Sequence, residues 1–215
     1  RLYAVALGKW LAVAALTGVL CGLIGSAFAL SVGYVTRLRA ANGWLLYLLP
    51  LAGVAVASVY RALRTEGMGT DDIIDAVHLG KPLSAKLVPS IFIGTVLTHL
   101  CGGSAGREGA ALQMGGTIGY WSSRALRLDD RDTRTGTLCG MAAFFSALFG
   151  TPLAATMFAI MAISVGELYH AAFIPCFTAS LVAYGLSMWL GVVPVRFTAV
   201  IPALASTGLV RAAIL

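Results

Sequence analysis

Long uncharged runs alternate with short charged segments along the chain. Residues 10–36, 40–60, 87–106 and 171–195 contain no Asp, Glu, Lys or Arg and are dominated by apolar side chains. A helix of about 20 apolar residues is long enough to cross the hydrocarbon core of a bilayer. We therefore predict a membrane-spanning helix in each run, and the start of another within residues 198–215.

A longer uncharged run, residues 135–166, is interrupted by Gly150, Thr151 and Pro152. Proline is tolerated in the first turn of a helix and disfavoured after it. The interruption therefore predicts that one helix ends near the glycine and that a second helix begins at the proline.

Two further segments are too short to cross the hydrocarbon core. Residues 70–78 follow a glycine-rich break at residues 67–69, and residues 108–123 follow another at residues 102–106. We expect Thr70 to be the N-cap of the first of these helices. Half-spanning helices that begin at such breaks are typical of a transporter ion site near the middle of the membrane.

The composition excludes most soluble classes of protein. Of the 215 residues, 59% are hydrophobic and 11% are charged, and the mean hydropathy is +0.87. A soluble domain carries roughly a quarter charged residues, and this chain has too few polar side chains to cover a surface in water. We predict an all-α integral membrane protein, multi-pass in the cell membrane, with lipid as one of its partners.

The distribution of charge also bears on partners. The formal net charge is +6, but the basic residues stand in small groups between the uncharged runs, as in the loops of multi-pass proteins. A nucleic-acid interface would gather them in one stripe, so we exclude that partner. The four cysteines stand singly, without the spacing of metal ligands or redox pairs, and we predict no metal, cofactor or disulfide.

Small residues recur at a helical spacing. Glycines separated by four positions allow two helices to approach closely. Such pairs occur at Gly18 and Gly22, Gly115 and Gly119, and Gly136 and Gly140.

Arg107 and Glu108 are the only fully charged residues between Lys86 and Arg124. A charge at membrane depth costs several kcal/mol, about 3 kcal/mol or more, unless it is paired, hydrated or neutralised. One reading is a structural Arg107–Glu108 ion pair. The functional reading uses the start of the helix, whose free N–H groups and partial positive charge attract anions. Glu108 could occupy that site as a carboxylate and leave it when protonated, which would couple anion movement to protons.

A different class of function has a weaker signal. Residues 102–106, G-G-S-A-G, match the G-x-S-x-G elbow of serine hydrolases, with Ser104 as nucleophile and His99 upstream. That elbow needs a strand before it, whereas an apolar helical run precedes it here. The other two histidines, His78 and His170, are expected to be capping or surface residues.

Three motifs together resemble the CLC family of chloride channels and anion/proton antiporters. Residues 106–110, G-R-E-G-A, resemble the family's G-[KR]-E-G-P signature. Residues 67–72, G-M-G-T-D-D, stand where the family has G-S-G-I-P-E, and residues 149–154, F-G-T-P-L-A, resemble its later helix start F-x-x-P-L-A. All three occur in the family's order.

The resemblance implies an architecture. Residues 1–195 would form the first of two inverted halves, in which half-spanning helices meet at a midplane anion site, and residues 196–215 would open the second half. The missing C-terminal half would complete the site. The resemblance further implies a non-enzymatic protein with a cytoplasmic N-terminus, which forms a homodimer through residues 152–164 and 171–190.

The resemblance also implies roles for individual residues. Glu108 matches the gating glutamate that couples anions to protons. The backbone of Arg107, Gly109 and Ala110 matches the anion-binding end of the same helix, with Ala110 in place of the family's proline. The motif at Gly150, Thr151 and Pro152 matches a helix start without an assigned contact to the anion.

The second break carries the signal for the transported ion. Met68, between Gly67 and Gly69, matches the family's anion-coordinating serine but has no hydroxyl group. This methionine and the run G-R-E-G-x-x-x-Q-M-G at residues 106–115 are similar to the fluoride/proton antiporter branch. Ala162 stands where proton-coupled chloride exchangers carry an internal glutamate. The implied function is fluoride/proton antiport; a chloride channel and a chloride/proton exchanger remain the alternatives.

Overall fold

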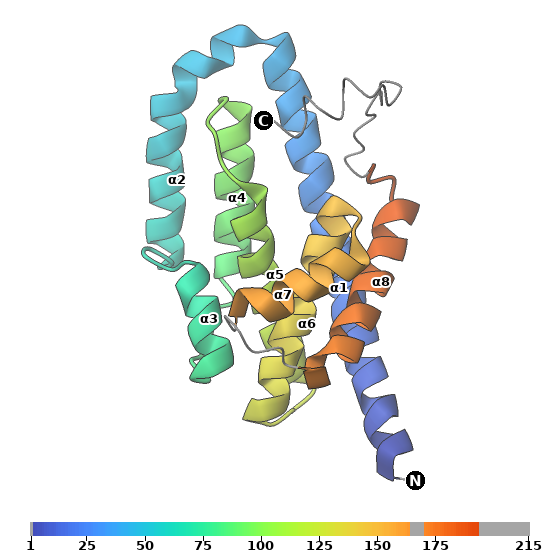
Figure 1. Ribbon diagram of the computed structural model, residues 1–215. Helices are drawn as coiled ribbons and strands as arrows, with labels where there is room; N and C mark the ends of the chain where they lie inside the picture. The colour runs from blue at the N-terminus through green and yellow to red at the C-terminus, as the bar shows by residue number, and fades with distance from the viewer. Residues whose placement is uncertain (1, 164–169, 194–215) are drawn as a thin grey trace, which may run out of the picture.

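The structure, a computed structural model, describes residues 2–163 and 170–193, with side chains from residue 8 onward. Within these ranges the chain is helical and the connections are short (Figure 1). The elements, of which η1 and η2 are 3-10 helices, are α1 Leu2–Ala41, η1 Gly43–Leu48, α2 Leu49–Leu63, α3 Thr70–His78, α4 Leu87–Leu100, α5 Arg107–Ala125, α6 Asp130–Phe149, α7 Pro152–Ile163, η2 His170–Ala172 and α8 Phe173–Trp189. The helix start expected within residues 198–215 lies outside the described residues.

Most of the expected crossings are found as long apolar helices. Among the described residues, the stretches long and apolar enough to cross a membrane are Gly8–Ala41, Gly43–Leu63 and His170–Trp189. They confirm the runs at residues 10–36, 40–60 and 171–195. The run at 87–106 was expected to span as well, but α4 ends at Leu100 because the chain turns at Gly102, which has a left-handed φ of +78°.

The interruption at Gly150 divides two helices as predicted. Gly150 adopts a left-handed conformation with φ of 69°, and its N–H donates to the carbonyl oxygen of Ser146 at 2.9 Å, which closes α6. Pro152 then begins α7. The glycine N–H pairs with a carbonyl oxygen at the end of one helix, and the proline, which has no N–H, leaves one donor fewer unpaired at the start of the next.

Two lengths differ from the prediction. α1 continues to Ala41, so Arg37 and Arg39 belong to the end of a helix and not to a loop. α5 has 19 residues and not 16, and at 1.5 Å per residue it extends over about 28 Å. The added residues are Arg107 at the start and Arg124 and Ala125 at the end, and the positive charge of Arg124 at the C-terminal end of a helix is electrostatically favourable.

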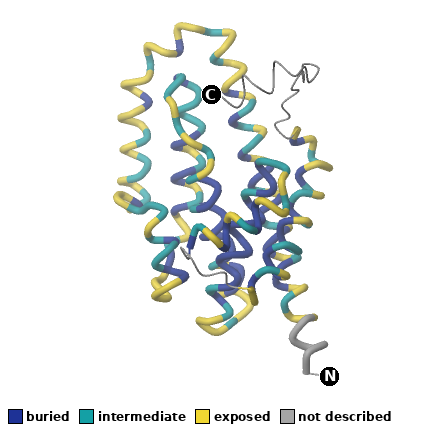
Figure 2. Tube along the Cα trace, in the orientation of Figure 1, coloured by how far each residue is buried: buried dark blue, intermediate teal, exposed yellow. Residues whose placement is uncertain are grey.

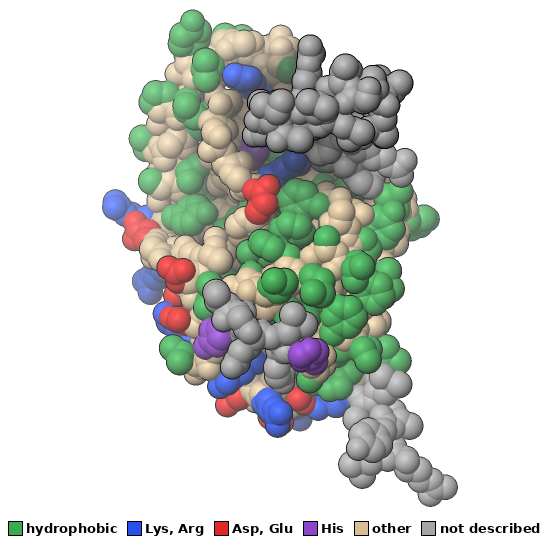
Figure 3. Space-filling view, viewed as in Figure 1, with side chains coloured by type: hydrophobic (Ala, Val, Ile, Leu, Met, Phe, Trp, Pro, Cys, Tyr) green, Lys and Arg blue, Asp and Glu red, His purple; other side chains and the backbone are tan. Residues whose placement is uncertain are grey.

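The helices form two regions of different burial. α1 runs diagonally through the molecule, and η1 and α2 return beside α4 (Figure 1). Buried residues concentrate where α5 and α6 meet α1 and α8, whereas most of α2 is exposed (Figure 2). Charged side chains gather along the lower edge in the view of Figure 3, and the sides above it are largely hydrophobic or uncharged.

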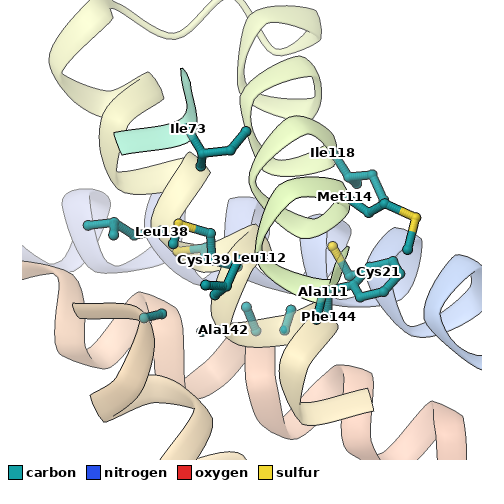
Figure 4. Close-up of a cluster of buried hydrophobic side chains, with 14 of the residues drawn as sticks. Cys21, Ile73, Ala111, Leu112, Met114, Ile118, Leu138, Cys139, Ala142 and Phe144 are labelled. Carbon is teal, nitrogen blue, oxygen red and sulfur yellow. The ribbon is translucent and has the colours of Figure 1, made fainter. Parts of the chain in front are cut away.

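The core is assembled from small residues as well as large ones. Phe144 of α6 lies beside Phe28 of α1, with 6.2 Å between ring centroids, and the surrounding cluster joins α1, α3, α5 and α6 (Figure 4). The thiols of Cys139 and Cys176 lie 3.8 Å apart, and the cysteines are free and buried. Sequence spacing gave no indication of this approach, because the two residues lie on different helices.

The glycine pairs lie where helices come into closest contact, as predicted. A Cβ atom on Gly119 would collide with the carbonyl oxygen of Gly136, and one on Gly140 with that of Gly115. α5 and α6 therefore meet backbone to backbone. On α1, a Cβ atom on Gly18 would lie 2.7 Å from the carbonyl oxygen of Ala179 in α8.

We predict that Gly140→Ala destabilises the protein by about 1–3 kcal/mol, because the added methyl group has only backbone to displace. Thermal unfolding of the detergent-solubilised full-length protein, followed by tryptophan fluorescence, measures the change. Gly53→Ala in α2 is the matched control, since nothing lies within 4 Å of the added Cβ atom. Equal melting temperatures for the two variants would show that the α5–α6 contact tolerates a side chain.

Candidate anion-binding site

The first turn of α5 is open to a ligand. Gly106 precedes the helix in an extended conformation, with φ of −68° and ψ of 142°, and no side chain caps the helix. The N–H groups of the first turn have no partner within an α-helix. Because these groups and the helix dipole both favour negative charge, this end of α5 has the physical properties of an anion site.

Glu108 and Arg107 point to different partners. The carboxylate of Glu108 folds back toward the helix start, since its Oε2 would lie 3.1 Å from a Cβ atom placed on Gly106. The Arg107 guanidinium lies over the ring of Phe149, 5.9 Å from its centroid. In the described part of the chain Glu108 is exposed and makes no ion pair. The structural Arg107–Glu108 pair is therefore not formed.

The start of α3 differs from the prediction. Gly69 and not Thr70 is the N-cap, and its N–H donates to Oδ2 of Asp72 at 2.9 Å. Because Asp72 reaches back to this N–H, the hydroxyl of Thr70 is free for another contact and accepts a hydrogen bond from Nε2 of Gln113 at 3.1 Å. Asp72 also accepts from Lys81 at 2.9 Å, and this pairing raises the pKa of Lys81.

The three predicted breaks meet around the start of α5. The Gln113–Thr70 hydrogen bond joins α5 to the start of α3, and the contact of Arg107 with Phe149 joins it to the break between α6 and α7. Met68 is half-buried and packs against the core cluster. The remaining motif residues lie as expected: Gly67 and Gly69 directly before α3, Gly109 and Ala110 in the first turns of α5, and Gly150 and Thr151 directly before Pro152 of α7.

Two arginines beside this site were not predicted as part of it. A cavity of about 320 Å³ is lined by Arg37, Arg107 and Leu148 together with residues 191–193, and its described lining contains no acidic side chain. The Arg39 guanidinium packs on Gly102, where a Cβ atom would lie 2.7 Å from its Nε, and this Nε is buried without a described hydrogen-bond partner. In the sequence, Arg37 and Arg39 are visible only as a basic group. Nothing in the sequence indicates that they lie near Arg107 and Gly102, because these residues are far away in the chain.

The hydrolase alternative lacks its structural context. Ser104 follows helix α4, whereas a nucleophile elbow follows a strand. His99 uses its Nδ1 for a 2.8 Å hydrogen bond with the carbonyl oxygen of Thr95 in its own helix. His78 ends α3 and its Nε2 lies 2.7 Å from the carbonyl oxygen of Ile163, as expected for a capping residue, and His170 is exposed.

Comparison with known proteins decides the family. The profile of the family described as "Voltage gated chloride channel" matches residues 51–215. The chain belongs to this family. It is 37% identical over 193 residues to the chloride/fluoride channel protein of Pseudomonas syringae pv. tomato, and this match covers 89% of this chain and 43% of that protein. It is 34% identical over 165 residues to the H(+)/Cl(-) exchange transporter ClcA of Vibrio vulnificus, which covers 68% of this chain and 35% of that protein.

Solved structures agree with this assignment. A crystal structure of a CLC-type fluoride/proton antiporter matches with a TM-score of 0.83 and 29% identity, covering 97% of this chain and 53% of that one. A slow cyanobacterial Cl-/H+ antiporter shares the fold, with a TM-score of 0.69 and 21% identity over 85% of this chain and 47% of that one. The chain is thus a membrane protein with the CLC fold, and it spans about half the length, or less, of the relatives it matches.

We predict that the Thr70–Gln113 hydrogen bond couples the starts of α3 and α5 by about 0.5–1.5 kcal/mol. Thr70→Val and Gln113→Ala, alone and together, form a double-mutant cycle read by thermal unfolding of the full-length protein. Thr98→Val replaces Thr70→Val in the control cycle, because its hydroxyl bonds only to Gly94 of its own helix. Additive effects of the Thr70 and Gln113 changes would contradict the coupling.

Proposed function

We propose that the protein that carries this chain transports halide anions across the membrane by exchanging fluoride for protons. The observation that supports it best is the uncapped start of α5 with the carboxylate of Glu108 folded over it. The carboxylate of Glu108 and a transported anion would compete for the same site at the start of α5. This competition is the physical basis of an exchange mechanism.

The proposed mechanism depends on the protonation of Glu108. As a carboxylate, Glu108 interacts favourably with the free N–H groups and the positive end of the α5 dipole, and it blocks the anion path. After protonation it loses this attraction and swings away, and the transported anion takes its place. Exposure of Glu108 and the absence of a described ion pair leave the side chain free to make this movement.

The cavity beside Arg107 has the positive charge that an anion site needs. Arg37 and Arg107 line it from α1 and α5, and no acidic side chain among the described residues opposes them. In a region of low effective dielectric constant, two such charges attract an anion more strongly than they would in water. Anions approaching the start of α5 would therefore be concentrated in the cavity beside Arg107.

The preference for fluoride rests on Met68 and on the relatives. A methionine provides no O–H donor, so the cost of dehydrating a small anion must be offset by backbone N–H groups or by the protonated Glu108. Two of the relatives reported above have names that mention fluoride, the channel protein of Pseudomonas syringae and the CLC-type antiporter. A chloride channel or a chloride/proton exchanger is the second candidate, because the second relative is named an H(+)/Cl(-) exchanger.

The arrangement of the whole protein is part of the proposal. We propose that residues 1–195 are the first of two inverted halves, that residues 196–215 open the second, and that the second half completes the anion site. A second copy of the protein would cover the outer faces of α7 and α8. These faces expose large apolar residues such as Leu153 and Ile174, whereas several small residues of both helices are buried inside, among them Ala155, Ala159, Ala179 and Ala183.

We predict that Glu108→Gln abolishes proton coupling, because the amide cannot carry a proton into and out of the site. Full-length protein in liposomes loaded with fluoride is followed with a fluoride electrode and a pH electrode in the same bath. Glu66→Gln is the matched control, since Glu66 is an exposed carboxylate paired with Arg61. Uphill fluoride movement driven by a proton gradient in Glu108→Gln protein would refute the mechanism.

We predict that Met68→Ser lowers the ratio of fluoride to chloride flux by about fivefold, since one added hydrogen bond is worth about 1 kcal/mol. The same liposomes, loaded with either anion, provide the measurement. Met157→Ser on α7 is the control for loss of a half-buried methionine elsewhere. An unchanged ratio would remove Met68 from the determinants of selectivity. Chloride efflux from unmodified protein without proton movement would favour the chloride channel.

A further inference from the structure

An apolar groove, separate from the cavity beside Arg107, lies where α1, α4 and α5 meet. It has a volume of about 470 Å³ and is lined mainly by apolar side chains, including Leu20 and Ile24 of α1, Val88 of α4, and Ile118 and Trp121 of α5. Ser122, which also lines the groove, shares a 2.9 Å hydrogen bond with the hydroxyl of Thr17, and this bond joins α5 to α1. The groove therefore has no unsatisfied polar group at this seam.

One end of the groove is at the charged edge of the protein. Ala85 and Ala125 line that end. Lys86 follows Ala85 in the chain, and Arg124 precedes Ala125. The other end lies deeper: α5 lines the groove from Ala125 back to Thr117, which is about 12 Å along the helix. The groove thus runs from the charged edge into the apolar part of the molecule.

The acidic residues at this edge are already engaged. Asp130 pairs with Arg124 at 3.1 Å, Asp132 pairs with Lys9, and Asp129 accepts from the backbone N–H of Asp132. Among the described residues, Lys86 has neither an ion pair nor a side-chain hydrogen bond. At the rim of the groove, the positive charge of Lys86 is therefore not neutralised by any acidic side chain among the described residues.

Lys86 occupies an electrostatically unfavourable position. It is the N-cap residue of α4, where the helix dipole already contributes partial positive charge. An anion at this point would interact favourably with both the side chain and the helix. Trp121 marks the same level: its ring is 47% exposed at the groove, and its indole N–H donates to the carbonyl oxygen of Leu83 at 3.0 Å. Tryptophan with a satisfied N–H and an exposed ring is typical of the membrane interface.

We propose that this groove binds an anionic phospholipid from the bilayer, with one acyl chain between α1, α4 and α5 and the phosphate group beside Lys86 and Arg124. Basic residues at the end of an apolar groove between membrane helices are complementary to such a lipid in both charge and polarity. A neutral lipid would leave the charge of Lys86 uncompensated. The bound lipid would hold the first turn of α4 against the last turns of α5.

The experiment titrates phosphatidylglycerol or phosphatidylcholine into delipidated full-length protein in a neutral detergent, with bound lipid counted by native mass spectrometry. Lys86→Gln removes the charge of the rim, and Ala85→Trp fills the open end of the groove. The matched controls are Arg64→Gln, an exposed basic residue at the end of α2, and Ala57→Trp, an exposed alanine within α2.

The proposal predicts that Lys86→Gln weakens phosphatidylglycerol binding about fivefold and leaves phosphatidylcholine binding unchanged. Ala85→Trp is expected to reduce binding of both lipids, and both controls to behave as the unmodified protein. Equal phosphatidylglycerol binding by Lys86→Gln and Arg64→Gln protein would overturn the proposal, even if Ala85→Trp protein did not fold. A folding defect of Ala85→Trp with normal lipid binding by Lys86→Gln would show that protein, and not lipid, fills the groove.

Discussion

The backbone contact between α5 and α6 is the constraint on which the rest of the structure depends. α5 is not among the described helices apolar enough to cross a membrane alone, yet it occupies the centre of the fold. Glycines on both helices let the two backbones touch. In a membrane, lipid tails solvate apolar side chains as well as a neighbouring helix does, so close packing must supply much of the helix association. Side chains at these positions would push α5 away from its neighbours.

This contact also explains where the two ends of α5 lie. The C-terminal end reaches the charged edge, where Arg124 pairs with Asp130. The N-terminal end contacts the start of α3 through Gln113 and the break after α6 through Arg107. An irregular backbone at membrane depth is stable only where protein or water covers it. The glycine contact therefore holds α5 against α6, which lets the start of α5 meet the breaks before α3 and after α6.

Charge is arranged differently at the two ends of α5. Near the start of α5, Arg37 and Arg107 line one cavity and Arg39 packs on Gly102 in the break before the helix, and this positive charge suits an anion that comes and goes. At the charged edge, acids and bases are mostly paired, and the free charge of Lys86 lies beside an apolar groove. The first arrangement favours a small ion in water, whereas the second favours a charged group that is attached to hydrocarbon.

The sequence by itself determined the class of the protein, most of the helices and the motif positions. Charge-free runs fix membrane helices because few charges can enter hydrocarbon, and Gly150 followed by Pro152 fixes a helix boundary because each restricts the backbone locally. Only the tertiary structure decided that Thr70 bonds to Gln113 and that Arg39 packs on Gly102. It also decided that several small residues of α7 and α8, such as Ala159 and Ala183, face inward. These contacts join residues far apart in the chain, and periodicity within one helix carries no information about which neighbour a face will meet.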